Sequence, residues 1–289
     1  MALEKPKWLK ARSTCCPGYY ETLKIVKSRG IHTVCEEDCC PNIGECWRNK
    51  TATFLIMGNI CTRKCGFCNI KTGCPSSLDL DEPRKVADSI FELGLKYAVI
   101  TSVTRDDLED NGAQHFASVI TAIKNKNPGI KVEILTPDFQ GNQDAIKIIC
   151  KSKPEVFGHN IEIIRRLHEI VKRKPGDYDV SLNFLKDIKK LYPNMITKTG
   201  MLVGVGESKE EVLEIIDDIK NADVNIMTIG QYMAPSTAHY PIARYVSLEE
   251  FAEYKEYGER RGIKIISAPL VRSSYDAAKI FDALCSGNI

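Results

Sequence analysis

Short apolar runs alternate with amphipathic stretches along the chain after residue 50. Several of the apolar runs are continuous, as expected for strands that are covered on both faces. In the amphipathic stretches, apolar residues recur at helical spacing. The pattern predicts strands at residues 53–57, 98–103, 132–136, 156–160, 198–205 and 226–231. It predicts helices at residues 84–93, 113–125, 143–150, 180–191, 209–220 and 248–261.

Strands that alternate with helices predict βαβ units, a parallel sheet and an α/β fold. Six units are fewer than the eight of a closed barrel. The sequence therefore favours a partial, open parallel β/α barrel of about six units, and a doubly wound sheet is the alternative. The stretch at 263–270 is a candidate for a further short strand. The barrel is expected over residues 51–268, with an irregular N-terminal extension at 1–50 and a short C-terminal tail at 269–289.

The composition is that of an ordinary globular protein, with 43% apolar residues in 289 and a net charge of +2. This balance gives no electrostatic reason to expect nucleic acid or a membrane surface as a partner. No apolar run approaches the roughly 18 residues of a membrane span. The first residues lack the apolar stretch of a secretory signal. The sequence therefore predicts a cytoplasmic protein.

Half of the twelve cysteines fall into two triplets. The first is Cys35-x4-Cys40-x5-Cys46, and the second is Cys61-x3-Cys65-x2-Cys68. Each triplet supplies three thiolates, where a [4Fe–4S] cluster held only by protein takes four. A cluster held by three thiolates keeps one iron open to a ligand. The triplets therefore predict iron–sulfur sites of a catalytic kind.

A zinc site and disulfide bonds are the alternatives for these cysteines. Zinc also prefers four ligands, and neither triplet has a histidine at finger spacing. Cys39 would complete a zinc site in the first triplet, and it also competes with Cys40 as the cluster ligand. Cys15 and Cys16 have no matching pattern. In a reducing compartment, such tight clusters are more often metal sites than disulfides.

Polar and glycine-rich residues follow the predicted strands at their carboxyl ends. Ligands of parallel α/β folds bind at that end of the sheet. The candidates for contacts to a bound cofactor are Thr101, Asn160, Glu162, Gly204, Gly206 and Gln231.

The second triplet, with the aromatic Phe67 before its last cysteine, resembles the CxxxCxΦC signature of the radical S-adenosylmethionine (SAM) superfamily. The resemblance implies that SAM chelates the open iron through its amino and carboxylate groups. Reductive cleavage of SAM then gives a 5′-deoxyadenosyl radical that takes hydrogen from an unactivated C–H bond. The cofactor supplies this chemistry, while the protein binds, orients and excludes water.

Nearly the whole chain resembles the lipoyl synthase family. The matching segments include TVCEEDCCPNIGECW, NICTRKCGFCNI, ITSVTRDDLEDNGAQHF, VEILTPDFQG, KTGMLVGVGE and VRSSY. The resemblance implies an auxiliary [4Fe–4S] cluster, which gives up its sulfur to the substrate, on Cys35, Cys40, Cys46 and Ser274. It also makes Arg272 a candidate for positioning the substrate. A hard serine oxygen suits iron–sulfur ligation less well than a thiolate does, as expected of a cluster that must come apart.

The implied reaction inserts sulfur at C6 and C8 of an octanoyl chain that is amide-linked to a lysine of a lipoyl carrier protein. It consumes two SAM molecules and needs an electron donor. The basic stretch at residues 171–174 is a candidate contact for an acidic carrier, and a solvated turn is the alternative. Competing functions are a sulfur-inserting enzyme of the biotin synthase type and an iron–sulfur scaffold or electron carrier. The triplet before the first predicted strand argues against the biotin synthase type.

Overall fold

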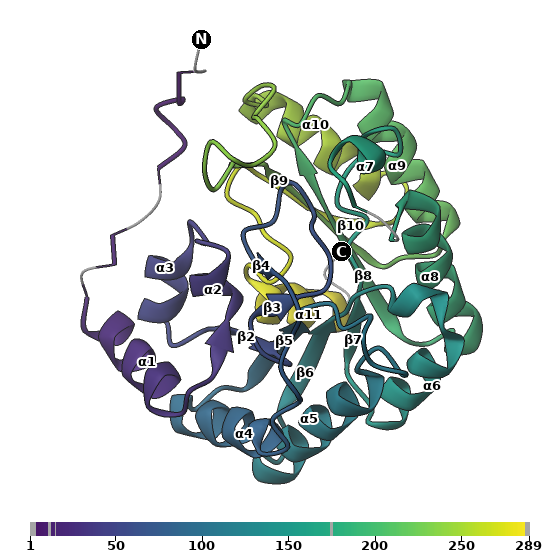
Figure 1. The fold of residues 1–289 in the computed structure, drawn as a ribbon. Helices are drawn as coiled ribbons and strands as arrows, with labels where there is room; N and C mark the ends of the chain where they lie inside the picture. The colour runs from purple at the N-terminus through teal and green to yellow at the C-terminus, as the bar shows by residue number, and fades with distance from the viewer. Residues whose placement is uncertain (1–3, 11–12, 15, 174–175, 287–289) are drawn as a thin grey trace. The chain divides into compact units, whose positions relative to one another are not determined.

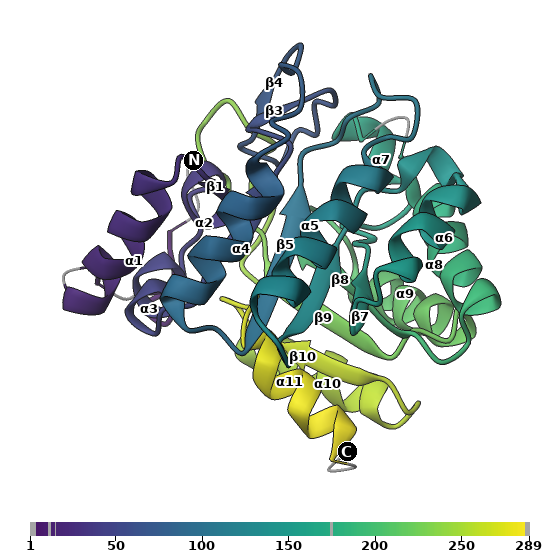
Figure 2. The same ribbon diagram turned by 90° about the horizontal axis from the view of Figure 1, so that it is seen from below.

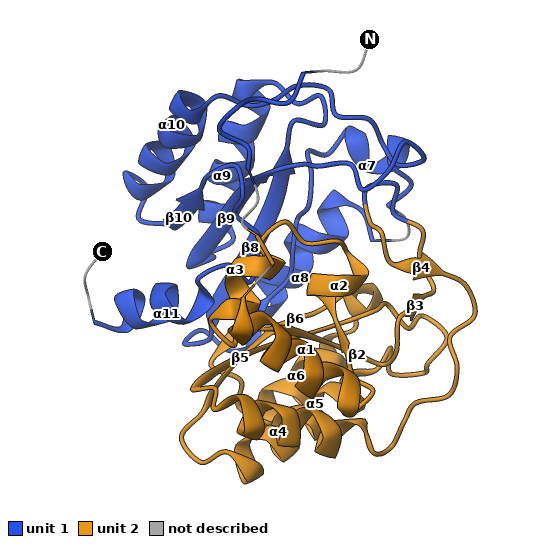
Figure 3. Cartoon of the chain, turned by 90° about the vertical axis from the view of Figure 1, so that its left-hand side faces the viewer, with its two compact units in different colours: residues 1–10, 65–67, 158–289 blue, residues 11–64, 68–157 orange. Residues whose placement is uncertain are grey.

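The computed structural model describes residues 4–10, 13–14, 16–173 and 176–286. Cys15 and Lys174, both named above as sequence features, lie outside the described residues. The chain falls into two units (Figure 3): residues 1–10, 65–67 and 158–289 form unit 1, and residues 11–64 and 68–157 form unit 2.

In unit 2, a mostly parallel sheet has the strand order β1-β2-β5-β6-β7. Its strands are β1 (His32–Thr33), β2 (Thr53–Ile56), β5 (Tyr97–Ser102), β6 (Lys131–Leu135) and β7 (Val156–Gly158), of which the last residue belongs to unit 1. β1 pairs antiparallel with β2, whereas β2 with β5 and β5 with β6 are parallel. All four residues of β2 are buried, as the continuous apolar run predicted.

Three long helices of unit 2 pack side by side against this sheet (Figures 1 and 2). They are α4 (Glu82–Leu93), α5 (Ala113–Lys126) and α6 (Gln143–Lys151). Their apolar stripes point inward, with Val86, Ile90 and Ile120 buried. Because Gly94 takes a φ of +69°, it ends α4 at the left-handed C-cap where glycine is favoured.

The N-terminal extension is helical, so the prediction of an irregular segment was wrong. It contains α1 (Pro17–Ser28), α2 (Val34–Glu37) and α3 (Ile43–Arg48). The buried Trp47 packs against Tyr19 of α1, and the Thr22 hydroxyl donates a hydrogen bond to the Trp47 carbonyl at 2.9 Å. One aromatic anchor therefore holds α3 to α1.

A loop and two short strands follow β2. β3 (Ile60–Cys61) pairs in parallel with β4 (Lys71–Thr72). The loop between them is closed at its base by the Gly73 N–H, which donates to the Cys61 carbonyl at 3.0 Å. A short 3₁₀ turn, η1 (Phe139–Gly141), follows β6.

Unit 1 contains three parallel strands, β8 (Ile196–Val203), β9 (Ile226–Gln231) and β10 (Lys264–Ser267). Its helices are α7 (Leu167–Ile170), α8 (Tyr178–Leu191), α9 (Lys209–Asn221), α10 (Leu248–Glu259) and α11 (Ala277–Cys285). Met201, Val203 and Ile229 share a core with residues of α8, α9 and α10. β10 confirms the further strand that was expected near the C-terminus, and α11 is a helix that the sequence did not predict.

The predicted α/β class and its parallel sheet are confirmed. Each predicted strand and helix ends within two residues of the observed element. Among the described residues, no helix is both long and apolar enough to cross a membrane.

Candidate functional site

Cys61 ends β3, and Cys65 and Cys68 follow in the loop that leads to β4; all three are half-buried. The Cys61 sulfur accepts two backbone N–H groups, from Arg63 at 3.4 Å and from Thr104 at 3.3 Å. Hydrogen bonds of this kind stabilise a thiolate and tune the potential of an iron–sulfur cluster. The surroundings of Cys61 therefore suit a cluster ligand.

The short segment from Cys65 to Phe67 belongs to unit 1. There the Gly66 N–H donates to the Val171 carbonyl at 2.7 Å, and the Gly66 carbonyl accepts the Tyr240 N–H at 2.8 Å. Phe67 packs against the apolar core of that unit. The aromatic residue of the signature thus anchors its loop.

In the first triplet, Cys35 lies in α2, Cys40 follows it in a loop, and Cys46 lies in α3. Cys35 is buried, whereas Cys40 and Cys46 are half-buried. Burial, together with the charge of the neighbouring Cys40, raises the pKa of the Cys35 thiol to about 11. A metal centre bound by both sulfurs would favour their thiolate forms and so offset this effect.

Cys39 differs from Cys40 in its surroundings. It is exposed and has a φ of +49°, and the Asn69 side-chain amide lies 3.5 Å from its sulfur. Asn69 also donates its backbone N–H to the Asp38 carboxylate and its side-chain amide to the Glu37 carbonyl. The residue after Cys68 thus holds the loop that carries Cys39.

No disulfide bond joins any of the described cysteines. Over the same residues, no three or more His, Cys, Asp or Glu side chains form a preformed metal-binding group. The cluster ligands named from the sequence therefore stay predictions.

The C-terminal tail lies over the strands of unit 1. The Ser273 hydroxyl donates to the Asn160 side-chain carbonyl at 2.9 Å. A Cβ at Gly200 of β8 would come within 2.7 Å of the Ser273 oxygen, and one at Gly230 of β9 would overlap the Val271 carbonyl. Because Gly200 and Gly230 alternate with the core residues of their strands, the tail covers the face opposite the helices.

The candidate residues at the strand ends make the following contacts. The Thr101 hydroxyl donates to the Leu135 carbonyl at 2.8 Å. Glu162, with a φ of +70°, donates its N–H to the Gly200 carbonyl and bridges to β8. The buried Gln231 amide binds the backbone of Tyr232, Arg244 and Val246 and so holds the loop that follows β9.

Gly204 and Gly206 form the turn after β8, with φ of +91° and +112°. A Cβ at Gly204 would overlap the Gln231 amide, whereas the space at Gly206 is open up to Ala243 at 3.8 Å. The turn therefore needs glycine at both positions, and at Gly206 it leaves room beside the backbone.

A model of the radical SAM superfamily matches residues 55–219. A lipoyl synthase from Rubrobacter xylanophilus is 51% identical over 274 residues, which cover 94% of this chain and 85% of the relative. A lipoyl synthase from Caldicellulosiruptor saccharolyticus is 49% identical over 276 residues, covering 95% of this chain and 96% of the relative. The chain belongs to the lipoyl synthase family. It is therefore a sulfur-inserting transferase of the radical SAM superfamily, which uses SAM and a [4Fe–4S] cluster.

Solved structures agree with the fold. The [FeFe]-hydrogenase maturase HydG has a TM-score of 0.61 at 14% identity, over 93% of this chain and 67% of that one. Methylornithine synthase PylB has a TM-score of 0.56 at 12% identity, over 74% and 70%. At such identity the likeness extends to the fold alone.

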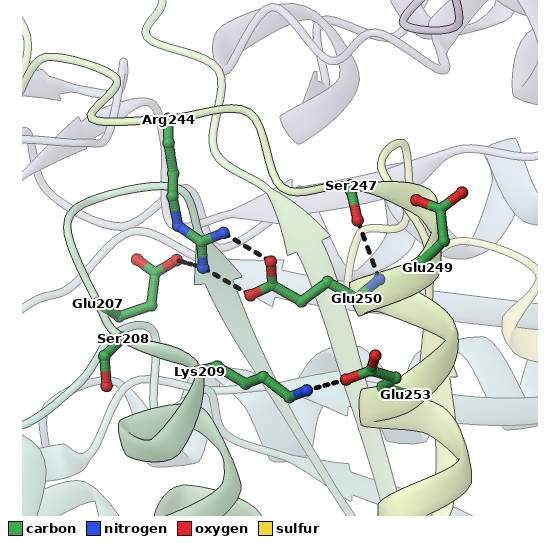
Figure 4. A pocket seen from close by; sticks show the side chains of 8 residues that line it. All are labelled: Glu207, Ser208, Lys209, Arg244, Ser247, Glu249, Glu250 and Glu253. Carbon is green, nitrogen blue, oxygen red and sulfur yellow. Dashed lines mark hydrogen bonds and ion pairs between the residues drawn. The ribbon is translucent and has the colours of Figure 1, made fainter.

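Beside the family segment KTGMLVGVGE, an acidic depression lies between the starts of α9 and α10 (Figure 4). The buried Glu207 accepts the N–H groups of Gly204 and Val205 at 2.7 and 2.9 Å. Arg244 spans Glu207 and Glu250 across this depression. Glu207 therefore supports the glycine turn through these two backbone bonds. Arg244 neutralises Glu207 and Glu250, so we assign the depression a structural role.

Three further residues of these sites, Glu207, Ser273 and Arg63, were not among the predicted site residues. Glu207 ends the GVGE segment and Ser273 begins the serine pair, so each had a local signal. Arg63 lies inside the second triplet, but its partners Asp106 and Asp138 are 43 and 75 residues away. No local pattern shows such a contact.

Proposed function

We propose that the chain inserts two sulfur atoms, at C6 and C8, into an octanoyl chain that is amide-linked to a lysine of a lipoyl carrier protein. The observation that carries this proposal is the near full-length match to the lipoyl synthase family together with both cysteine triplets. When bound, one [4Fe–4S] cluster with SAM supplies hydrogen abstraction, and an auxiliary [4Fe–4S] cluster supplies the sulfur. One SAM is consumed for each hydrogen removed.

Cys61, Cys65 and Cys68 are the proposed ligands of the cluster that binds SAM. The fit rests on Cys61, since two backbone N–H groups face its sulfur and favour the thiolate form. The packing of Phe67 against the core fixes the loop between the other two cysteines. The role of these residues is to hold the cluster while one iron stays open to SAM.

Cys35, Cys40 and Cys46 are the proposed ligands of the auxiliary cluster. The interaction between Cys35 and Cys40 supports Cys40 in preference to Cys39. Cys39 is exposed, and Asn69 contacts its sulfur. Burial of Cys35 fits a cluster that must be kept from water until it reacts.

Ser274 is the proposed fourth ligand of the auxiliary cluster. The choice of Ser274 follows the resemblance of the VRSSY segment to the family motif, and its neighbour Ser273 donates its hydroxyl to Asn160. Arg272 is proposed to position the substrate. One of its guanidinium N–H groups donates to the Val271 carbonyl at 2.7 Å.

The proposed SAM contacts lie at the carboxyl ends of β5, β7, β8 and β9. Among the proposed SAM contacts, Gly206 has the strongest support, because the space beside its backbone is open. The side chains of Thr101, Asn160 and Gln231 form hydrogen bonds with other segments of the chain. Their proposed role is therefore to fix the walls of the site. Gly204 and Glu162 complete the proposed set.

The strands and helices are proposed to form a partial, open barrel of about six βα units over residues 51–268. Residues 1–50 then form the extension with the auxiliary ligands, and residues 269–289 the tail with Ser274. The proposed partners are an octanoylated carrier protein or domain and an electron donor. The net charge of +2 gives no electrostatic reason for binding to nucleic acid or to a membrane surface. The proposed location is the cytoplasm.

The test is an anaerobic assay of the reconstituted protein with SAM, a reductant and an octanoyl-lysyl peptide. The proposal predicts about eight irons per chain, formation of 5′-deoxyadenosine and a peptide that gains two sulfur atoms. A Cys40→Ala variant, which keeps the second triplet, should still cleave SAM but leave the peptide without sulfur. Cleavage of SAM by the unaltered protein with no change in the peptide would contradict the proposed substrate.

A further inference from the structure

A single arginine beside Cys61 holds two aspartates. Arg63 donates from Nε and Nη2 to the two carboxylate oxygens of Asp106, each at 2.8 Å. It donates from Nη1 and Nη2 to the two oxygens of Asp138, at 2.6 and 2.8 Å. Paired arginine–carboxylate bonds of this kind fix geometry as well as charge. Arg63 is 9% exposed and Asp138 1%, so the pair that they form is shielded from water.

The two aspartates follow neighbouring strands of unit 2. Asp106 lies in the loop after β5, and Asp138 lies just after β6. Gln140 reinforces both, since its backbone N–H donates to Asp138 and its side-chain amide to Asp106. Arg63 therefore ties the segment that carries Cys61 to the carboxyl ends of two strands.

The segment at 61–63 also pairs directly with the segment at 104–106. The Thr62 N–H and hydroxyl both donate to the Thr104 carbonyl at 3.1 Å, and the Asp106 N–H donates to the Thr62 oxygen at 3.2 Å. These two segments supply the two N–H groups that face the Cys61 sulfur, one from Arg63 and one from Thr104. Both donors keep their places only while the two segments stay together.

We infer that Arg63 is a positioning residue for Cys61, and that its double ion pair holds segment 61–63 against segment 104–106 so that both N–H groups bond to the Cys61 sulfur. Breaking a buried pair leaves uncompensated carboxylates, so the loss of Arg63 should free both segments. Lysine supplies a point charge without the planar fork and cannot bind both carboxylates in paired fashion. The consequence at the cluster rests on the proposed function, whereas the position of the segments does not.

The first test uses the full-length protein without clusters and measures hydrogen–deuterium exchange of peptides that cover the two segments. We expect Arg63→Ala to raise exchange in both by at least about tenfold, and Arg63→Lys to have an intermediate effect. The matched control is Arg84→Ala, because Arg84 also pairs with two aspartates in unit 2, Asp81 and Asp88, but has an exposed side chain. Wild-type exchange in Arg63→Ala would overturn the inference.

Asp138→Asn gives a second route if Arg63→Ala does not fold. It removes one of the two ion pairs and keeps the shape of the side chain and the pair with Asp106. Faster exchange in both segments, smaller than for Arg63→Ala where that protein can be measured, is the expected result. Unchanged exchange in Asp138→Asn would contradict a clamp that needs both aspartates.

The second test measures the midpoint potential of the cluster on the second triplet, in a parent that carries Cys35→Ala, Cys40→Ala and Cys46→Ala. Since N–H groups on the sulfur favour the reduced, more negative cluster, their loss should move the potential to a more negative value. We expect this shift in Arg63→Ala, part of it in Arg63→Lys, and none in Arg84→Ala. A purely structural role predicts fewer clusters at an unchanged potential, and that result would overturn the inference. If the parent holds no cluster, the proposed function fails, while the exchange result still decides the position of the segments.

Discussion

Ser273 and Asn160 are 113 residues apart in the chain, yet the Ser273 hydroxyl donates a hydrogen bond to the Asn160 side chain at 2.9 Å. Gly200, between them on β8, has no side chain, and a Cβ there would clash with both. The tail therefore lies in a space that glycine leaves open. The position of Ser273 against β8 also fixes the backbone position of the next residue, Ser274.

The two serines of the tail should respond differently to replacement. Ser273→Ala removes one hydrogen bond and should lower the free energy of unfolding by about 1 kcal/mol, while the auxiliary cluster is kept. Ser274→Ala should keep the fold and weaken the auxiliary cluster, so that iron falls from about eight toward about four per chain. Iron analysis of both variants after the same reconstitution makes the comparison. Loss of iron in Ser273→Ala alone would show that Ser274 is the wrong serine.

Gly200→Ala should displace the tail without altering any proposed ligand. Its methyl group would lie within 2.8 Å of the oxygens of Ser273, Thr228 and Asn160. Overpacking of this kind costs about 1–3 kcal/mol. Limited proteolysis should cut the tail near residues 268–276 sooner than in the unaltered protein. Resistance equal to that of the unaltered protein would show that the tail does not need this space.

Cys39 and Cys40 offer a matched pair for the auxiliary site. Cys40→Ala should lose about four irons per chain, because Cys40 is the thiol that interacts with Cys35. Cys39→Ala should keep them, since Cys39 is exposed. The reverse pattern in an iron count would mean that Cys39, and not Cys40, is the second ligand of the first triplet.

The carboxylate of Glu207 should matter more than its neighbours in the acidic depression. Glu207→Gln replaces one acceptor oxygen by an N–H₂ group that faces a backbone N–H of Gly204 or Val205. We expect a loss of about 1–3 kcal/mol in the free energy of unfolding and weaker SAM binding in a titration of the reconstituted protein. Glu249→Gln, exposed at the rim of the same depression, is the control and should change neither. Equal effects of the two changes would refute a special role for the glycine turn.

His168 should make the protein less stable in mild acid. Burial, and then the charge of Arg173, lowers the pKa of this histidine to about 4. Between pH of about 4 and about 6.5 the unfolded chain binds the extra proton, so the free energy of unfolding falls as the pH falls through this window. The contribution is about 3 kcal/mol or less. His168→Gln should flatten the pH dependence measured by urea unfolding. A slope in His168→Gln equal to that of the unaltered protein would show that His168 is not the group responsible.

The alternation of apolar runs and helical stretches was enough to predict the bounds of the strands from β2 to β9, the two short strands β3 and β4 excepted. These strands are covered by the rest of the fold, so their sequences are largely apolar. The helices of the first 50 residues escaped prediction because α1 buries only Thr22 and Val26 along its length. α11 escaped because its N-cap residue, Asp276, has a φ of +51° and makes no side-chain cap hydrogen bond.

The cysteines of both triplets could be named from their spacing and family motifs, whereas their supports could not. Arg63 meets Asp106 and Asp138 only because β5 and β6 are neighbours in the sheet. The contact of Ser273 with Asn160 likewise depends on where the tail returns. Contacts between residues so far apart in the sequence can be identified only from the folded structure.

The proposed source of the inserted sulfur is the chain's own auxiliary cluster. This role is tested by the mass of the peptide product after a single turnover, with clusters reconstituted from heavy-isotope sulfide and with unlabelled free sulfide present. We predict a product that carries two heavy sulfur atoms, formed only when Cys35, Cys40, Cys46 and Ser274 are intact. A product that carries unlabelled sulfur, or labelled product from the variant without the first triplet, would contradict it.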